Sequence, residues 1–150
     1  MAFIDADDIW VPGKLNAQCS TLAENPELDG VFGHVQAFAS PDLSAELQKC
    51  IRINTRLEPG FMKSSLLLRR TAFERIGRFD ESRRGADFID WYARAISLGF
   101  RWKMLPDLVH LRRIHADNMG RRDRARQHDN YLQTMAQLIA RKRASGGVVA

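Results

Sequence analysis

The stretch Ala-Phe-Ile-Asp-Ala-Asp-Asp at residues 2–8 joins three apolar residues to three carboxylates. We predict that Ala2–Ile4 forms a short buried strand that ends at Asp5. In an extended chain, residues i and i+2 point the same way, so Asp5 and Asp7 can present their carboxylates together at the strand end, where α/β sheets bind ligands. Two hard oxygen ligands there suit Mg²⁺ or Mn²⁺ and, through the metal, a diphosphate. The alternative is that Asp7 and Asp8 only cap the following turn.

Apolar residues recur at helical spacing in four segments of the chain, so we predict four helices. The predicted helices cover residues 12–24, 71–77, 85–99 and 121–143. The first begins at Pro12 and should turn Leu15, Cys19 and Leu22 toward the core. Thr71 is placed to cap the second helix, which a glycine at position 77 ends.

Four further segments are predicted to be strands, so the expected fold class is α/β with helices flanking a mixed sheet. The predicted strands cover residues 31–38, 65–68, 100–105 and 108–113. The last two should pair as a hairpin around the turn Pro106-Asp107, and this pairing makes the expected sheet mixed. Residues 40–60 show no period, so we expect a loop there with one helical turn at 43–47.

The composition is typical of one soluble globular domain: the chain has 150 residues, 45% of them hydrophobic and 27% charged. No apolar run approaches the roughly 18 residues of a membrane span, and the N-terminus lacks the basic region of a signal peptide. We therefore expect a cytoplasmic protein, with a peripheral position at the inner membrane face left open. Cys19 and Cys50 fit no zinc or disulfide spacing and are expected to be buried.

The net charge of +5 comes from the C-terminal third of the chain. Residues 1–99 hold 12 Lys and Arg against 14 Asp and Glu, a net charge of −2, whereas residues 100–150 hold 11 against 4, a net charge of +7. The arginines at 121–126 are more typical of a solvated helix face, and binding of nucleic acid or an anionic membrane is the alternative. Acidic residues lie among the arginines and no aromatic residue alternates with them, so a nucleic-acid partner is not favoured.

Four motifs follow one another along the chain. They are Phe-Ile-Asp-Ala-Asp-Asp-Ile-Trp-Val-Pro-Gly-Lys-Leu at 3–15, Leu-Leu-Leu-Arg-Arg-Thr-Ala-Phe-Glu-Arg-Ile-Gly-Arg-Phe-Asp-Glu at 66–81, Gly-Ala-Asp-Phe-Ile-Asp-Trp-Tyr-Ala-Arg-Ala at 85–95 and Arg-Arg-Ile-His-Ala-Asp-Asn at 112–118. In this order they resemble motifs of the inverting glycosyltransferases of family 2, which have the GT-A fold. The resemblance starts at the Asp-x-Asp motif and covers about residues 1–120, the C-terminal half of that fold.

The resemblance implies an enzyme that transfers a sugar from a nucleotide-diphosphate sugar to an acceptor hydroxyl with inversion, with a UDP-sugar as the expected donor. It implies that Asp7 binds Mn²⁺ or Mg²⁺ and that Asp5 shares the metal or contacts the ribose of the donor. His115 is a candidate third metal ligand or diphosphate contact, and a structural histidine is the alternative. Arg112 and Arg113 beside it are candidates for binding the phosphates.

The general base is less directly assigned, because the chain departs from the family motif at the third helix. Inversion requires a base that deprotonates the acceptor hydroxyl. The family has Glu-Asp at the start of this helix, six residues before the arginine that Arg94 matches, and here Phe88 stands at the base position. Asp87 and Asp90 are both candidates for the base. We favour Asp87 because it lies at the start of the helix.

The resembled fold also has a nucleotide-binding half before its Asp-x-Asp strand, which requires about 60 residues or more. We therefore expect a truncated transferase-like domain over residues 1–143, with the N-terminal half absent and a flexible tail at 144–150. An exposed apolar edge should lead to self-association or to pairing with the missing half. The alternative function is a non-enzymatic interaction module or remnant that binds a partner protein or polyanion through the basic face at 112–143.

Overall fold

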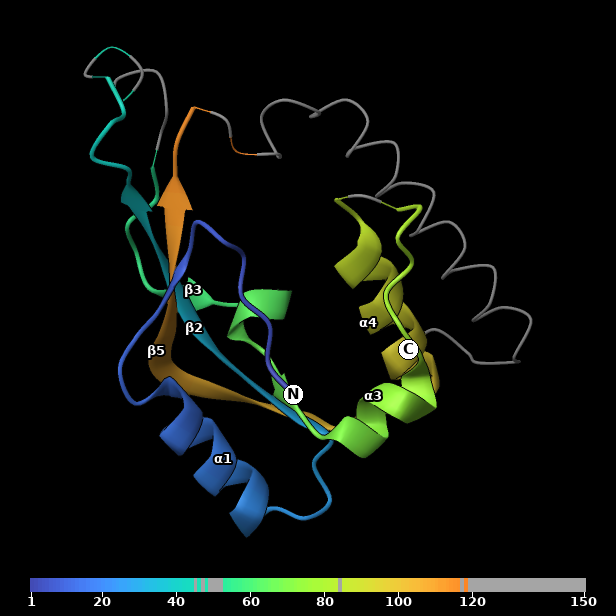
Figure 1. Cartoon of the computed structure of the whole chain (residues 1–150). Helices are drawn as coiled ribbons and strands as arrows, with labels where there is room; N and C mark the ends of the chain where they lie inside the picture. Colours follow the sequence, from blue (N-terminus) through green and yellow to red (C-terminus); the bar gives the residue numbers. More distant parts are fainter. Residues whose placement is uncertain (45, 47, 49–52, 84, 117, 119–150) are drawn as a thin grey trace, which may run out of the picture.

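The computed structural model describes residues 1–44, 46, 48, 53–83, 85–116 and 118. It has helices on both sides of a mixed sheet (Figure 1), which confirms the predicted α/β class. In chain order the elements are β1 (Ile9–Trp10), α1 (Lys14–Glu24), β2 (Gly30–Ala39), β3 (Glu58–Pro59), the 3₁₀ helix η1 (Lys63–Ser65), β4 (Leu67–Leu68), α3 (Arg70–Ile76), α4 (Asp87–Ser97) and β5 (Trp102–Ile114).

Some predictions fall on other parts of the chain. The helix at 121–143, the tail at 144–150 and Cys50 lie outside the described residues, as do positions 45 and 47 of the expected turn at 43–47. Among the described helices, none has the length and apolar character needed to cross a membrane.

The central pair of the sheet is β2 and β5, which run parallel. The strand order is β1-β5-β2-β3, with β4 also paired to β2, and the three short strands β1, β3 and β4 pair antiparallel. A parallel pair requires a long crossover connection, and the segment between β2 and β5 that contains α3 and α4 provides it. The sheet is therefore mixed, as predicted, but its pairing differs from the one expected.

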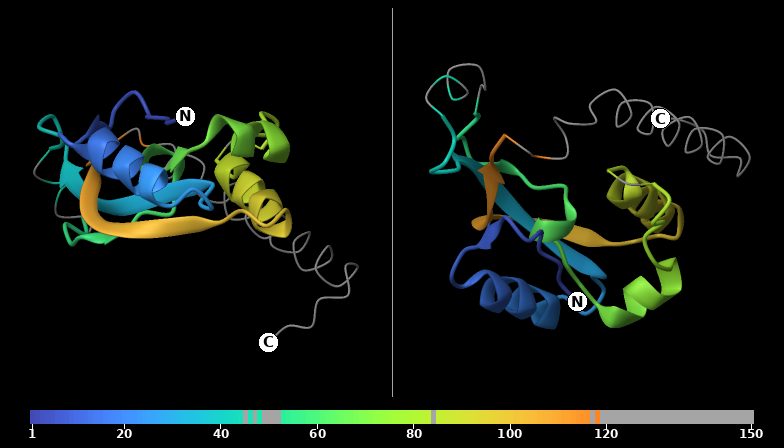
Figure 2. Two further views of the ribbon diagram at one scale, coloured as in Figure 1. Left: turned by 90° about the horizontal axis from the view of Figure 1, so that it is seen from below. Right: turned by 45° about the horizontal axis from the view of Figure 1, so that its top comes forward.

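Residues 102–114 form one continuous strand, β5, which curves along the sheet (Figure 2), so the predicted hairpin around Pro106-Asp107 is wrong. Pro106 lies next to a register shift in the pairing with β2. Proline has no N–H to donate, and an irregular register accommodates that loss without ending the strand. The imidazole Nδ1 of His34 lies 2.7 Å from the carbonyl oxygen of Leu105 and so contacts the backbone at this irregularity.

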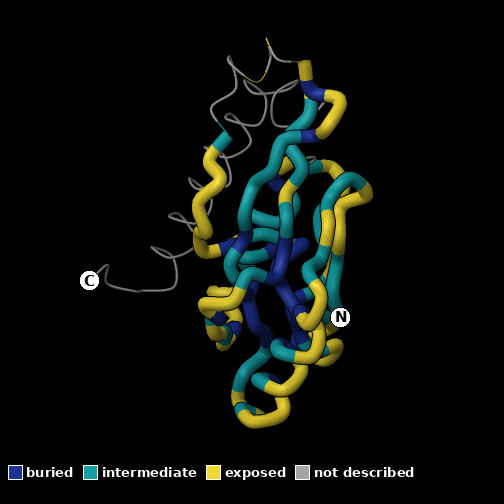
Figure 3. The backbone as a smooth tube through the Cα atoms, turned by 90° about the vertical axis from the view of Figure 1, so that its left-hand side faces the viewer, coloured by how far each residue is buried: buried dark blue, intermediate teal, exposed yellow. Residues whose placement is uncertain are grey.

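Neighbouring residues of β2 and β4 point to opposite faces of the sheet, and each face has its own core. One core, under α1, contains Leu22, Val31, Leu67 and Leu105. The other, under α3 and α4, contains Phe32, Leu66, Leu68, Ala72, Ile76, Trp91, Ala95 and Phe100. The buried backbone in the middle of the molecule corresponds to these strands (Figure 3).

The buried face of α1 is polar, which differs from the prediction. Lys14, Gln18 and Leu22 face the sheet, whereas Leu15 and Cys19 are exposed, and the helix begins at Lys14 instead of Pro12. The Gln18 amide donates to the carbonyl oxygens of Val31 at 2.9 Å and Ser65 at 2.7 Å. The two carbonyl oxygens lie in the interior and need hydrogen-bond donors there. The helix therefore turns the amide of Gln18 and the ammonium group of Lys14 inward.

The strand predicted at Ala2–Ile4 is reduced to a single bridge between Ala2 and Leu67. The backbones of Met1 and Leu68 exchange hydrogen bonds of 2.5 and 2.9 Å. Ile4 is 46% exposed, so the segment is not buried as predicted. The segment pairs along one side with β4. Because β4 is short, the pairing amounts to a single bridge.

Two of the predicted helices, α3 and α4, are present, with one change at the start of α3. Arg69 occupies the N-cap position of α3 without a side-chain cap, so Thr71 lies inside the helix and does not cap it. Gly77 ends α3 as predicted, at a φ of 93° that favours glycine. Its carbonyl oxygen accepts a hydrogen bond of 2.8 Å from the indole of Trp91 in α4. This bond joins the end of α3 to the buried face of α4.

Candidate functional site

A pocket of about 510 Å³ opens where the N-terminal loop, η1, the start of α4 and the end of β5 meet. Its walls include the carboxylates of Asp5, Asp7 and Asp87 and the cationic side chains of Lys63 and Arg112. These residues come from four separate segments of the chain. The tertiary structure therefore brings together four residues that the sequence singled out, and it adds the lysine.

Asp7 is paired with His115 beside this pocket. The imidazole Nε2 lies 2.8 Å from Asp7 Oδ2. The turn that carries the imidazole is held by Asn118, whose side chain accepts from the His115 N–H at 2.6 Å and donates to the Arg113 carbonyl at 3.1 Å. Burial acts to raise the pKa of Asp7, but the hydrogen bond from His115 and the charges of His115 and Arg112 outweigh it and leave the pKa below its ordinary value. Asp7 is therefore a carboxylate at neutral pH.

Asp8 connects the same loop to β5. Its Oδ2 lies 2.9 Å from Nε2 of His110, which is fully buried, and its Oδ1 accepts the backbone N–H of Arg113 at 2.8 Å. The Arg113 Nε in turn donates to the carbonyl oxygen of Asp7 at 2.8 Å, and its guanidinium lies 4.9 Å from the centre of the Phe38 ring. Arg113 thus holds the backbone of the loop, while Arg112 faces the pocket.

Neither aspartate caps the helix that follows the loop. The N-cap of α1 is Gly13, and it makes no side-chain hydrogen bond to the helix. Asp7 and Asp8 instead bond to the end of β5, more than a hundred residues away in sequence. Asp8 thus has a structural role, as the alternative to ligand binding expects, although its side-chain contacts are to β5 and not to the helix.

Asp87, the first residue of α4, forms an ion pair with Lys63 across the pocket. The Lys63 Nζ lies 2.6 Å from Asp87 Oδ2. The side chains are 29% and 22% exposed, so both remain accessible to a ligand in the pocket. The carboxylate is thus held in one orientation without being closed off from solvent.

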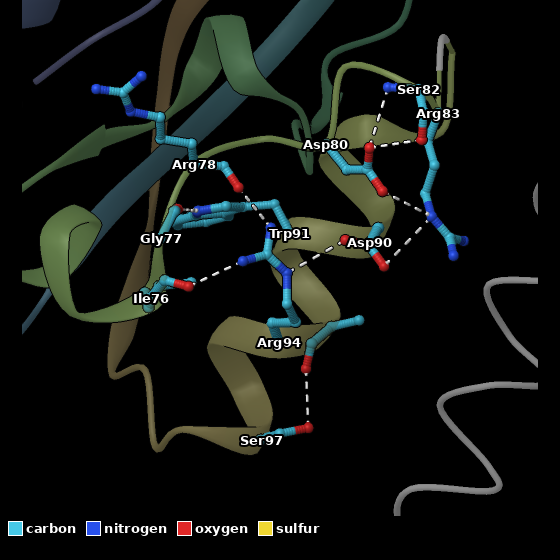
Figure 4. A network of polar contacts seen from close by, with 11 residues as sticks. Ile76, Gly77, Arg78, Asp80, Ser82, Arg83, Asp90, Trp91, Arg94 and Ser97 are labelled. Carbon is cyan, nitrogen blue, oxygen red and sulfur yellow. Dashed lines mark hydrogen bonds and ion pairs between the residues drawn. The ribbon is translucent and has the colours of Figure 1, made fainter.

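Asp90 belongs to a different network, on the side of α4 that faces α3 (Figure 4). Its side chain is only 9% exposed, and its Oδ2 accepts from Arg94 Nε at 3.2 Å, with Arg83 Nε 3.9 Å from Oδ1. Arg94 also donates to the carbonyl oxygen of Ile76 at 2.9 Å. Of the two carboxylates considered for the base, Asp87 lies at the pocket and Asp90 joins α4 to α3.

The side chains predicted to bind a divalent cation, Asp5, Asp7 and His115, lie on the N-terminal loop and just after β5. Within the described ranges, no group of three or more His, Cys, Asp or Glu side chains is arranged to hold a metal ion. Mg²⁺ is commonly bound through one or two protein carboxylates together with substrate phosphates and water. Asp7, paired with His115, and Asp5, which accepts a 3.2 Å hydrogen bond from Ser64 Oγ, are compatible with such a site.

Two residues of the site have no signal in the sequence. Lys63 stands outside the four motifs and between the loop predicted at 40–60 and the strand predicted at 65–68. His110 stands in an apolar strand where a buried position would ordinarily be hydrophobic. Both are recognised from their contacts with aspartates distant in sequence. No family model matches this chain, and no curated protein is similar to it.

Proposed function

We propose that this chain is a glycosyltransferase that transfers a sugar from a nucleotide-diphosphate sugar, with UDP-sugar as the first donor to test, to an acceptor hydroxyl with inversion. The observation that carries the proposal is that Asp5, Asp7 and Asp87 line one pocket together with Lys63 and Arg112. The reaction needs a base for the acceptor hydroxyl and positive charge for the leaving diphosphate, and these side chains can supply both. The order of the four sequence motifs supports the same assignment.

On this proposal, the Asp-x-Asp loop holds the donor. Asp7 and Asp5 would bind Mn²⁺ or Mg²⁺ together with oxygens of the donor, and the bound ion would neutralise charge on the leaving diphosphate. His115 orients Asp7 through its hydrogen bond. Arg112 adds a positive charge on the same wall of the pocket. Arg113 and Asp8 act indirectly, because they hold the backbone of the loop in place.

Asp87 is the proposed general base. Its carboxylate accepts the proton of the acceptor hydroxyl while the oxygen forms its bond to the sugar. The bond from the sugar to the diphosphate breaks, and its electron pair leaves with the diphosphate. Lys63 orients the carboxylate of Asp87. Asp90 has a structural role, because its carboxylate already forms an ion pair with an arginine side chain.

Isothermal titration calorimetry with UDP, in the presence and absence of Mn²⁺, tests the donor site. We expect Mn²⁺-dependent binding that weakens by about tenfold or more in Asp7→Asn, since one charge-assisted contact is worth that factor. Asp107→Asn is the matched control, because Asp107 is exposed on β5 and lies outside the pocket. Unchanged binding in Asp7→Asn would contradict the metal site.

We also propose that the chain associates with itself or with a nucleotide-binding half through its N-terminal segment. Large apolar side chains are exposed there: Met1, Ile4, Ile9 and Leu15 are 39%, 46%, 41% and 43% exposed. The alternative function, an interaction module acting through residues 112–143, depends mainly on residues outside those that the structure describes. No observation in the described part favours it.

A further inference from the structure

A second pocket, of about 300 Å³, adjoins the first, and Met62 and Arg112 form walls of both. It lies between β2, β3 and the end of β5. Its apolar lining consists of Val35, Ala37, Ile53, Pro59, Met62 and Ile114. Asn54, Arg56, Glu58 and Arg112 supply the polar lining. The proposed function does not use this space.

The outer wall of the second pocket is anchored to β2. The Gln36 amide donates to the Thr55 carbonyl at 2.7 Å, and the Gly60 N–H donates to the Gly33 carbonyl at 3.1 Å. A Cβ atom at Gly60 would lie 2.4 Å from Val35 Cγ1, so only glycine allows the wall to approach this closely. The pocket is therefore built by specific contacts and does not depend on one flexible side chain.

The charged groups of the second pocket are mostly positive. In the part of the chain that the structure describes, neither Arg56 nor Arg112 forms an ion pair, and both are exposed. The single carboxylate of the lining, Glu58, accepts a hydrogen bond from the Asn54 amide. Guanidinium groups bind phosphate and carboxylate strongly through paired N–H donors. The pocket thus combines two anion-binding groups with apolar walls.

We propose that the second pocket binds the acceptor beyond its reacting hydroxyl, and that this part of the acceptor is an apolar segment carrying a negatively charged group. The identification of the ligand as the acceptor rests on the proposed function, whereas the binding itself does not. Arg112 and Met62 belong to both pockets, so a ligand seated in the second can extend its hydroxyl into the first, where Asp87 lies. The acceptor is therefore an anionic amphiphile.

Octyl phosphate, kept below its critical micelle concentration, is the probe, and calorimetric titration gives its Kd. We expect it to bind wild-type protein about tenfold or more tightly than inorganic phosphate, which lacks the apolar tail, or octyl glucoside, which lacks the charge. Arg56→Gln should weaken octyl phosphate binding by about tenfold. Arg101→Gln is the matched control, because Arg101 is exposed before the opposite end of β5.

Two outcomes would overturn the second site: equal affinity for octyl phosphate and octyl glucoside, or an unchanged Kd in Arg56→Gln. Circular dichroism of Arg56→Gln checks that the variant is folded. Titration of UDP and Mn²⁺ into the same variant separates the two proposals, because Arg56 does not line the first pocket. Intact UDP binding without octyl phosphate selectivity overturns the second site alone. Octyl phosphate selectivity without UDP binding overturns the donor site alone.

Discussion

Two basic side chains, Lys14 and His110, are buried close to the loop that carries Asp5 and Asp7. Lys14 donates to the Gln18 side chain at 2.6 Å and lies 4.8 Å from the centre of the Trp10 ring, without a carboxylate partner among the described residues. Burial lowers its pKa from 10.5 to about 8. Both side chains sit where a hydrophobic residue is the usual choice, so we expect each to affect stability in a measurable way.

The stability of the protein should depend on pH through Lys14. Its pKa is lower in the folded state, about 8, than the ordinary value of 10.5, so between these values the unfolded state binds more protons. The free energy of unfolding therefore rises as the pH increases from about 8 to 10.5, by up to roughly 3 kcal/mol for this group. Urea unfolding at pH 7 and pH 10 measures it, and Lys14→Met should lack this part of the rise. Lys103→Met, at an exposed position, is the control, and an equal rise in all three proteins would contradict the prediction.

Asp8 should contribute to stability through two buried contacts. In Asp8→Ala, the His110 imidazole and the Arg113 N–H both lose their acceptor in the interior. We expect a loss of about 2–4 kcal/mol in the free energy of unfolding, and a smaller loss in Asp8→Asn, which keeps an acceptor oxygen. Chemical denaturation of both variants tests this, with Asp107→Ala as the exposed control. Equal stability of Asp8→Ala and the control would show that the contacts contribute nothing.

At the scale of elements, β2 organises the second pocket. It pairs with β5 along its length, and its other side receives β3 and β4. Val35 and Ala37 of β2 therefore line the second pocket between β3 and the end of β5. Close approach at two glycines makes this possible. Gly33 has no room for a Cβ, which would lie 2.4 Å from Val109 of β5, and Gly60 meets Val35 at the same distance. The close approach of the backbone at these two glycines, more than the size of the lining side chains, thus sets the shape of the second pocket.

Gly60→Ala should disturb this spacing. The new methyl group would lie 2.4 Å from Val35 Cγ1 and 2.7 Å from the Gly33 carbonyl oxygen, so the segment after β3 must move outward. We expect a loss of about 1–3 kcal/mol in the free energy of unfolding, together with weaker octyl phosphate binding. Thermal unfolding and the calorimetric titration measure the two effects. A wild-type melting temperature in this variant would contradict the close approach.

At the scale of the whole molecule, the N-terminal segment is one of the places where large apolar side chains are exposed. Ile4 and Ile9 flank the Asp-x-Asp loop, 46% and 41% exposed, next to a segment that pairs with β4 along one edge. Apolar groups at an unpaired edge favour association with another chain or another segment. The donor site and the association surface would then lie side by side.

Sedimentation velocity tests this association. We expect the weight-average sedimentation coefficient of the wild-type protein to rise with concentration, and the rise to disappear in the double variant Ile4→Ser, Ile9→Ser. The substituted side chains are exposed, so the variant should keep the wild-type circular dichroism spectrum. A wild-type protein that remains monomeric at all concentrations would contradict the prediction.

Local patterns in the chain predicted the elements whose signals are themselves local. The periodicity of α4 and the apolar run of β2 both correspond to elements in the structure, and so does the glycine stop at Gly77. The Pro106-Asp107 pair also looked like a local signal, but proline is compatible with either a turn or an irregular strand. Which of the two forms is decided by β2, since the pairing with β2 supplies the hydrogen bonds that keep β5 extended.

The sequence by itself determined the α/β class and the candidate carboxylates Asp5, Asp7 and Asp87, because strand and helix periods and the acidic motifs are properties of neighbouring residues. Only the tertiary structure decided that Lys63 pairs with Asp87, and that His110 and His115 pair with the aspartates of the N-terminal loop. It also separated Asp90 from the pocket. The physical reason is that the histidine contacts form when β5 returns past the first residues of the chain, and the Lys63–Asp87 contact forms when η1 and the start of α4 meet. Packing between separate segments leaves no periodic trace in the sequence.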